Sequence, residues 1–248
     1  MTDGRVASLW RYPIKSHGRE EMAEVALSPG GTIPYDRHWA VAHEESGADG
    51  SAWVSCRNFS RVAKAPELMA ITAQLDEGTN RITLSHPARA NLTFDPDHDG
   101  TALIAWAGGF VPEGRARSAR VVRGPGRGFT DSDFPSVTLC NHSSHRAVEQ
   151  RAGQPLSIHR WRGNIWLDGL GPWEEFEWIG REVRIGAALL RVVERTGRCL
   201  ATHANPETGR RDVDVLRTLD HWGHGDFSVR AEVIEGGVIR PGDPVSPP

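Results

Sequence analysis

The fold of the second half of the chain is decided by the segment Val183-Arg-Ile-Gly-Ala-Ala-Leu-Leu-Arg-Val-Val-Glu-Arg-Thr-Gly-Arg-Cys199. Its apolar first part predicts a strand from Val183 to Glu194, and Thr196-Gly197 then breaks the pattern. Cys199 follows this turn, near two guanidinium groups that favour a thiolate, which is the form that binds metals and acts as a nucleophile. A lone cysteine is more often a small buried hydrophobe. Its place at a strand end beside a turn makes Cys199 a candidate for facing a pocket.

The rest of the second half predicts short strands and one clear helix. Asn141 to Ser144 offer N-cap side chains, and a helix is expected from Ser144 to Ala152, ended by Gly153. Residues 213–219 suit either a short helix or an extended segment. Strands are expected at 101–106, 119–123, 165–167 and 227–235, and the tail 238–245 is expected to pair with 227–235 across Gly236-Gly237.

The first half of the chain also predicts short strands separated by frequent turns. Such a pattern is typical of a small barrel or sandwich. Asp95-Pro-Asp-His-Asp-Gly100 is a polar break, at which we place the boundary between domains 1–95 and 96–248. The expected fold class is therefore mainly β with a few helices (α+β). The strands expected before the boundary are 6–12, 24–27, 38–42, 70–75 and 81–84.

Composition narrows the class of protein. The 248 residues carry a formal net charge of -3, which gives no support for a nucleic-acid partner. The N-terminus shows no apolar signal-peptide core, and no apolar run reaches the roughly 20 residues that span a bilayer. The three cysteines are odd in number and far apart, so a disulfide framework is not expected. A reducing cytoplasm is the expected location.

Several motifs in order along the chain resemble one known family. They are Tyr-Pro-Ile-Lys-Ser at 12–16, Asp-Arg-His-Trp at 36–39, Ser-Cys-Arg at 55–57, Trp-Arg-Gly-Asn-Ile at 161–165, Gly-Arg-Cys at 197–199, Pro-Glu-Thr-Gly at 206–209 and Ile-Arg-Pro-Gly-Asp-Pro-Val at 239–245. Together they resemble the MOSC family, in the group that carries an N-terminal MOSC β-barrel domain before the MOSC β-barrel domain. The amidoxime-reducing component and its bacterial relatives typify this group.

The resemblance implies a molybdenum cofactor (molybdopterin) bound between the two halves. Cys199 corresponds to the family's cysteine and would give molybdenum a thiolate ligand, a soft donor that suits this metal. The matching polar residues would hold the cofactor, with forked arginine donors suited to its phosphate. These expected cofactor-binding residues are Lys15, Ser16, Arg37, Arg57, Ser132, Arg162 and Asn164, together with Cys199.

The same resemblance implies a molybdenum-dependent oxidoreductase that reduces N-hydroxylated substrates such as amidoximes and hydroxylamines. The chain shows no iron–sulfur cysteine spacing and no flavin or nicotinamide fingerprint, so a separate electron-transfer protein is the expected donor. Two alternatives stay open. One is a sulfur carrier or transferase that uses a Cys199 persulfide, and the other is a non-catalytic module that only binds the cofactor.

Two further groups of residues offer competing chemistry. Cys140, His142 and His145, with His221 and His224, contain ligand types found in zinc sites. The run Asp131-Ser-Asp133 offers carboxylates for acid–base work, although Ser132 is the more plausible cofactor contact in this run.

Overall fold

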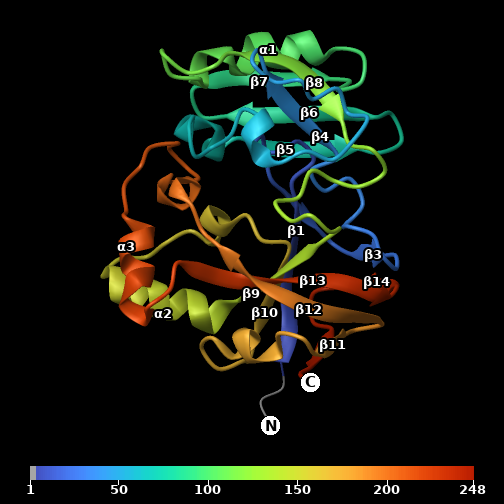
Figure 1. The fold of residues 1–248 in the computed structure, drawn as a ribbon, viewed down its shortest axis with the longest axis vertical. Coiled ribbons are helices and arrows are strands. Elements are labelled where there is room, and N and C mark those ends of the chain that lie inside the picture. The colour runs from blue at the N-terminus through green and yellow to red at the C-terminus, as the bar shows by residue number, and fades with distance from the viewer. Residues whose placement is uncertain (1–3) are drawn as a thin grey trace.

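The computed structural model describes residues 4–248, which form two stacked parts (Figure 1). The upper part in that view contains β4 to β8 and α1, and the lower part contains β9 to β15 together with β1 and β3. The mainly β class with a few helices is confirmed. No helix within residues 4–248 has the length and apolar character needed to cross a bilayer.

The lower part is a closed barrel of seven strands. β1 (Gly4–Arg11) pairs with both β15 (Pro244–Ser246) and β10 (Ile165–Asp168), and these pairings close the ring. The remaining order is β10, β9 (Val137–Asn141), β13 (Asp226–Glu235), β12 (Ala188–Gly197), β11 (Glu182–Ile185) and β15. The barrel is therefore built from the second half of the chain and one strand from its very start.

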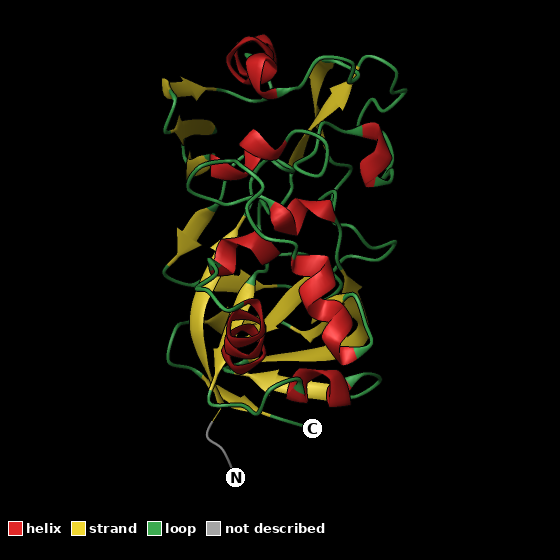
Figure 2. Ribbon diagram, turned by 90° about the vertical axis from the view of Figure 1, so that its left-hand side faces the viewer, coloured by secondary structure: helices red, strands yellow, loops and turns green. Residues whose placement is uncertain are grey.

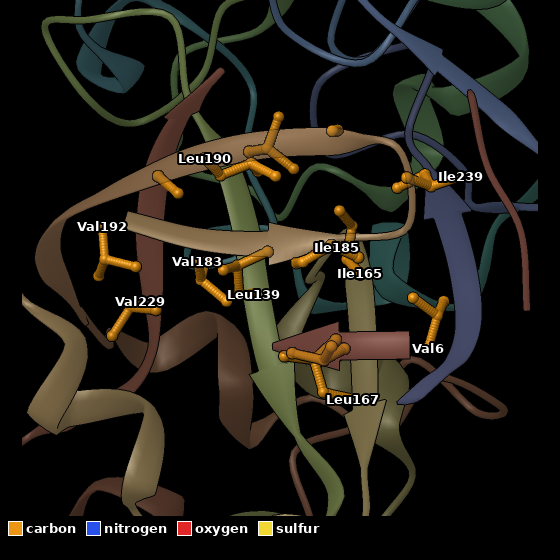
Figure 3. Close-up of a cluster of buried hydrophobic side chains, with 14 of the residues drawn as sticks. Val6, Leu139, Ile165, Leu167, Val183, Ile185, Leu190, Val192, Val229 and Ile239 are labelled. Carbon is orange, nitrogen blue, oxygen red and sulfur yellow. The ribbon is translucent and has the colours of Figure 1, made fainter. Parts of the chain in front are cut away.

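Alternating apolar side chains fill the interior of this barrel, as expected for a small closed barrel. Figure 3 shows side chains from β1, β9, β10, β11, β12 and β13 pointing toward one another. The cluster also takes in side chains from β3 (Val25–Leu27), which pairs with β14 (Gly237–Ile239) at the barrel's edge. β2 (Glu20–Met22) extends the sheet beyond β1.

The upper part has its own core. β4 (Trp39–His43) pairs with β8 (Ser118–Arg123), while β5 (Thr72–Asp76), β6 (Arg81–His86) and β7 (Arg89–Phe94) form an antiparallel meander. α1 (Gly100–Ala107) packs on these strands through Leu103 and Ala107. This core includes α1, so residues on both sides of the proposed 95/96 boundary contribute to it.

Two helices cover the outside of the barrel. α2 (His142–Ala152) connects the parallel strands β9 and β10, and α3 (Val215–Leu219) packs beside it. Both lie at the left of Figure 1 and in front of the barrel strands in Figure 2. As expected, Asn141 is the N-cap of α2, its side chain accepting a 2.8 Å hydrogen bond from Ser143 N–H, and Gly153 ends the helix in the left-handed region.

Three expected elements differ from the structure. Residues 101–106 are not a strand but most of α1, because a short apolar run suits either element and Leu103 and Ala107 share one helix face. The strand expected from Val183 is two strands, β11 and β12, joined at Gly186, whose φ of +52° allows the tight turn.

The tail does not pair with β13. β14 pairs with β3 and β15 pairs with β1 and β11, so each tail strand binds a strand distant in sequence from it. The sequence predicts one strand on each side of Gly236-Gly237, and two strands so close in sequence most simply pair as a hairpin. Barrel closure supplies better partners, because it leaves no open edge at β11 or β1.

Candidate functional site

A cavity of about 280 Å³ lies where the upper part meets the barrel. Its wall combines the segment after β1, the turn before β4, the 3₁₀ helix Cys56–Asn58 and the strand ends of the barrel. Among the lining residues, seven side chains are cationic and only Asp131 is acidic. The cations are Lys15, Arg37, Arg61, Arg160, Arg162, Arg198 and Arg230. Such a wall favours an anionic ligand.

The structure brings together five of the eight residues expected to bind a cofactor. Lys15, Ser16 and Arg37 reach the cavity from the first half of the chain, and Arg162 and Cys199 reach it from the second half. The segment that carries Lys15 follows β1 directly, and its backbone is tied to β4 by a 2.7 Å hydrogen bond from Lys15 N–H to Trp39 O. The two halves therefore meet at one site.

Lys15 is buried in the wall of the cavity. Its Nζ donates to Asp131 Oδ1 and to Phe129 O, each at 2.7 Å. Burial lowers the pKa of Lys15, and the ion pair with Asp131 opposes that shift. Although its partial burial raises the pKa of Asp131, the charge of Lys15 lowers it below its ordinary value. The pair is thus charged, and Asp131 holds the ammonium in place.

The guanidinium groups of Arg37 and Arg162 both lie over one buried aromatic ring. Their guanidinium carbons are 4.7 Å and 4.4 Å from the ring centre of Tyr12. The ring is fixed by its hydroxyl, which donates a 3.0 Å hydrogen bond to Gly163 O. Arg37 also donates to Arg162 O at 2.7 Å. Tyr12 thus makes a cation–π contact with each of two neighbouring cations.

The two arginines differ in how their charge is balanced. Arg37 forms an ion pair with Asp36, a carboxylate only 1% exposed that also accepts from Tyr12 N–H at 2.8 Å. Burial lowers the pKa of Arg37, but Asp36 raises it above its ordinary value. No described carboxylate pairs with Arg162, and burial lowers its pKa to about 10. Of these two arginines, Arg162 is therefore the one whose charge is left for an external anion.

Three cavity residues adopt a backbone conformation that side-chain-bearing residues rarely use. Ser16, Arg37 and Arg162 have φ values of 65°, 51° and 50°. A left-handed conformation at a residue with a side chain costs about 1–3 kcal/mol, and such residues gather at functional sites. The surrounding hydrogen bonds stabilise the backbone conformation of all three residues. The orientation of these side chains is therefore achieved at a cost in folding free energy.

Cys199 lies at the mouth of the cavity with an exposed side chain. It precedes the 3₁₀ helix Leu200–His203, and its carbonyl accepts from Thr202 N–H at 3.1 Å and Thr202 Oγ1 at 3.0 Å. Arg198 also lines the cavity, and its guanidinium donates to Trp161 O at 2.8 Å and to Phe227 O at 2.6 Å. Burial lowers the pKa of Arg198 to about 10. These hydrogen bonds anchor the residue that directly precedes Cys199.

Two buried polar atoms in the cavity wall have no partner among the described residues. They are Thr196 Oγ1 and Arg160 Nε. The other nitrogens of Arg160 are satisfied by Asp212 at 2.7 and 2.8 Å and by the carbonyls of Thr202 and His203. A buried polar group without a partner is costly. Both atoms therefore support a polar ligand in this cavity.

Three expected residues do not line the cavity. Asn164 is buried, and its side chain joins β9 to β1 by accepting from Thr138 N–H and donating to Trp10 O at 3.1 Å each. Ser132 is buried, and its hydroxyl donates to Phe134 O at 2.7 Å within its own loop. Arg57 lines a second cavity instead. Asn164 and Ser132 support the wall, since their polar atoms are used inside the protein.

The cysteine and histidine groups considered for zinc are not assembled. No cluster of three or more possible metal ligands occurs within residues 4–248. His145 uses both ring nitrogens, one accepting from Trp161 Nε1 at 2.9 Å and the other bonding Leu156 O at 3.0 Å. Cys140 is buried, which raises its pKa to about 12. These residues belong to an aromatic core behind the cavity.

Some lining residues had no signal in the sequence. Arg61 and Arg230 lie outside the recognised motifs. Tertiary packing places Arg61 in the cavity wall, and the pairing of β13 with β12 places Arg230 there. Arg198 is part of the Gly-Arg-Cys motif and is one of the two guanidinium groups expected to favour the Cys199 thiolate, whereas Arg160, which directly precedes the motif at 161–165, was not predicted. Asp131 was noted for acid–base work, and the structure places it in the wall as the partner of Lys15.

Comparison with known proteins agrees with this arrangement. Residues 3–107 match the MOSC N-terminal beta barrel domain, and residues 128–246 match the MOSC domain. The mitochondrial amidoxime-reducing component 1 of Mus musculus is 25% identical over 98% of this chain and 82% of its own length. The protein of that name from Xenopus laevis is 31% identical over 46% of this chain and 36% of its own length.

A second kind of relative carries a different name. The molybdenum cofactor sulfurase of Drosophila grimshawi is 24% identical over 84% of this chain, which corresponds to 29% of that longer protein. Both kinds of relative are therefore similar to this chain across its two parts.

Proposed function

We propose, from the premise that this chain belongs to the MOSC domain family, that its cavity binds a molybdenum cofactor for the reduction of N-hydroxylated compounds. One observation carries the proposal: an exposed thiol and seven cationic side chains line the same cavity. Similarity to the mitochondrial amidoxime-reducing component 1 of Mus musculus supports the substrate class. The electrons would come from a separate electron-transfer protein.

The residues present fit such a cofactor. A molybdopterin offers phosphate oxygens at one end and a thiophilic metal at the other. The cavity offers the unpaired cation Arg162 and the hydrogen-bond donors of Lys15 and Ser16 for the first, and Cys199 for the second. The partnerless atoms Thr196 Oγ1 and Arg160 Nε would find partners on the polar pterin.

The residues of the cavity would divide the work of holding the cofactor between its phosphate and its metal. Arg162, held by Tyr12, would bind the phosphate together with Lys15. Arg37 would support both, because it donates to Arg162 O and is itself fixed by Asp36. Cys199 would supply a thiolate to the metal. When bound, the cofactor would exchange two electrons and an oxygen atom with the substrate. The protein's part is to hold the cofactor and leave an approach beside Cys199.

The test is production of the full chain in a host that makes molybdenum cofactor. We expect about one molybdenum and one pterin per chain, and reduction of an aromatic amidoxime with a chemical reductant. Cys199→Ala should abolish the reduction, whereas Cys140→Ala, a buried cysteine outside the cavity, should not.

Other results would support one of the alternative functions or refute the proposal. Bound cofactor without reduction of any N-hydroxylated compound would indicate a binding module. A persulfide on Cys199 without molybdenum would indicate a sulfur carrier. Protein that takes up neither pterin nor molybdenum in that host would refute the proposal.

A further inference from the structure

A second cavity of about 280 Å³ lies in the upper part of the molecule. It is bounded by the end of β4, the 3₁₀ helix Cys56–Asn58, the segment that follows it and the loop 111–116. Among the described residues, Arg61 alone lines both cavities. A volume near 300 Å³ is at the lower end for small-ligand pockets. The volume of the second cavity equals that of the first cavity, so the class of ligand has to be inferred from the chemistry of the lining residues.

The second cavity has an excess of positive charge. Arg57, Arg61, Lys64 and Arg115 line it, against one carboxylate, Glu45. None of these five side chains takes part in the ion pairs found among residues 4–248. In a chain with a net charge of -3, such a local excess is not a property of the whole surface. It favours a small anion.

One histidine atom in the wall also lacks a partner. His43 Nε2 lies 2.8 Å from Arg57 O. A carbonyl oxygen can only accept, so Nε2 carries the proton and the neutral ring leaves Nδ1 as a bare acceptor. Nδ1 is buried and has no partner among the described residues. A ligand with a hydroxyl or a protonated oxygen would satisfy it.

The Ser-Cys-Arg motif at 55–57 separates the two cavities. Cys56 lines the first and Arg57 lines the second. Arg61 Nη1 donates to Cys56 Sγ at 3.1 Å, so one guanidinium connects the two walls. The role expected for Arg57 at the cofactor is therefore not supported by its position, and the motif residue is left free for a different ligand.

We propose that the second cavity is a separate binding site for a small dianion, such as a phosphate ester or a dicarboxylate. Arg57, Lys64 and Arg115 supply its cationic contacts, and a ligand that also carries a hydroxyl, such as a sugar phosphate, donates a hydrogen bond to His43 Nδ1. Phe59 and Val111 form the apolar part of the wall. The site does not depend on molybdenum cofactor being bound in the first cavity.

The experiment is calorimetric titration of the full-length, cofactor-free protein with inorganic phosphate and with succinate at low salt. The double variant Arg57→Ala/Arg115→Ala removes two exposed arginines that make no side-chain hydrogen bond in the described structure. The control Arg151→Ala/Arg181→Ala removes two exposed arginines outside both cavities. Arg162→Met tests the first cavity.

We expect two classes of site for phosphate. The Arg57/Arg115 variant should weaken one class by about tenfold to a hundredfold, as loss of charged hydrogen bonds predicts, while Arg162→Met affects only the other. Binding of phosphate alone would assign a phosphate ester, and binding of both anions a general dianion site. A single class unaffected by the Arg57/Arg115 variant, an equal loss in the control, or no binding of either anion would overturn the proposal.

Discussion

Replacing Arg162 with methionine should stabilise the cofactor-free protein while weakening its hold on an anionic ligand. The guanidinium is buried beside Tyr12 and no described carboxylate pairs with it, and burial lowers its pKa from 12.5 to about 10. Because the folded-state pKa lies below the unfolded-state value, folding disfavours the charged form at every pH below about 10. The fall corresponds to roughly 3 kcal/mol of unfavourable charge burial at neutral pH.

The expected gain is smaller than this figure. Methionine loses the cation–π contact with Tyr12, worth about 0.5–2 kcal/mol, but keeps an apolar stem of similar length. A net stabilisation of about 1–2 kcal/mol remains. In a chain of this length each kcal/mol raises the melting temperature by roughly 2–4 °C. The apo protein should therefore melt about 2–8 °C higher.

Arg160→Met is the matched control. Arg160 is also a buried arginine of the cavity wall, but it forms a two-bond ion pair with Asp212 at 2.7 and 2.8 Å. Removing one partner of such a pair leaves an uncompensated charge. This variant should melt lower than wild type, opposite in sign to Arg162→Met.

The assay combines thermal unfolding of apo protein with pterin and molybdenum content of protein from a cofactor-competent host. Arg162→Met should lose about tenfold to a hundredfold in affinity for the anionic ligand. If it lowered the melting temperature and retained full cofactor, Arg162 would be a structural residue and the phosphate assignment would be wrong.

Three further outcomes are expected. Gly163→Ala should destabilise the protein by about 1–3 kcal/mol, because a Cβ there would lie 2.1 Å from Cys140 Sγ. In denaturant unfolding, adding Cys140→Ala should restore most of this lost stability. If the two substitutions together cost the sum of their separate effects, the clash would be refuted. His17 is buried, and burial lowers its pKa from 6.5 to about 4. Because the unfolded chain takes up this proton first, the free energy of unfolding should fall by roughly 3 kcal/mol as the pH drops from 6.5 to 4. His17→Gln should flatten the pH dependence of unfolding in this range, and an unchanged slope would exclude His17 as its cause. A fragment of residues 96–248 should neither unfold cooperatively nor bind cofactor, because it lacks the barrel strand β1 as well as Lys15 and Arg37; wild-type cofactor content in a cooperatively melting fragment would show that the first half is dispensable.

The sequence predicted the fold class because alternation and turn residues are local properties. β1, β4, β6 and β10 were all expected within a few residues of their observed bounds. Residues 101–106 were assigned wrongly because a run of six apolar or small residues carries no clear period. The tail pairing was wrong because strand partners are chosen by barrel closure, which depends on the entire chain.

The candidate site was predictable only where motifs marked it. Lys15, Arg162 and Cys199 do line one cavity, from positions far apart in the sequence. The sequence alone could not separate cavity residues from those that support the wall. Asn164 is a structural tie between strands, and Arg37 is already neutralised by buried Asp36. Arg37→Ala would therefore disturb folding as well as ligand binding, which makes Arg162 the sharper probe.

The pairing of β1 also bears on how the protein is made. β1 leaves the ribosome before its partners β10 and β15, which lie at residues 165–168 and 244–246. At roughly 5–20 residues per second, β1 waits on the order of 10–30 seconds for β10 alone. Most of the upper part, from residue 34 to residue 123, is synthesised in the meantime, although its core also takes in Ile14 and Ala204. The cavity that joins Lys15 to Cys199 cannot form until residue 199 has been synthesised and the barrel strands have paired.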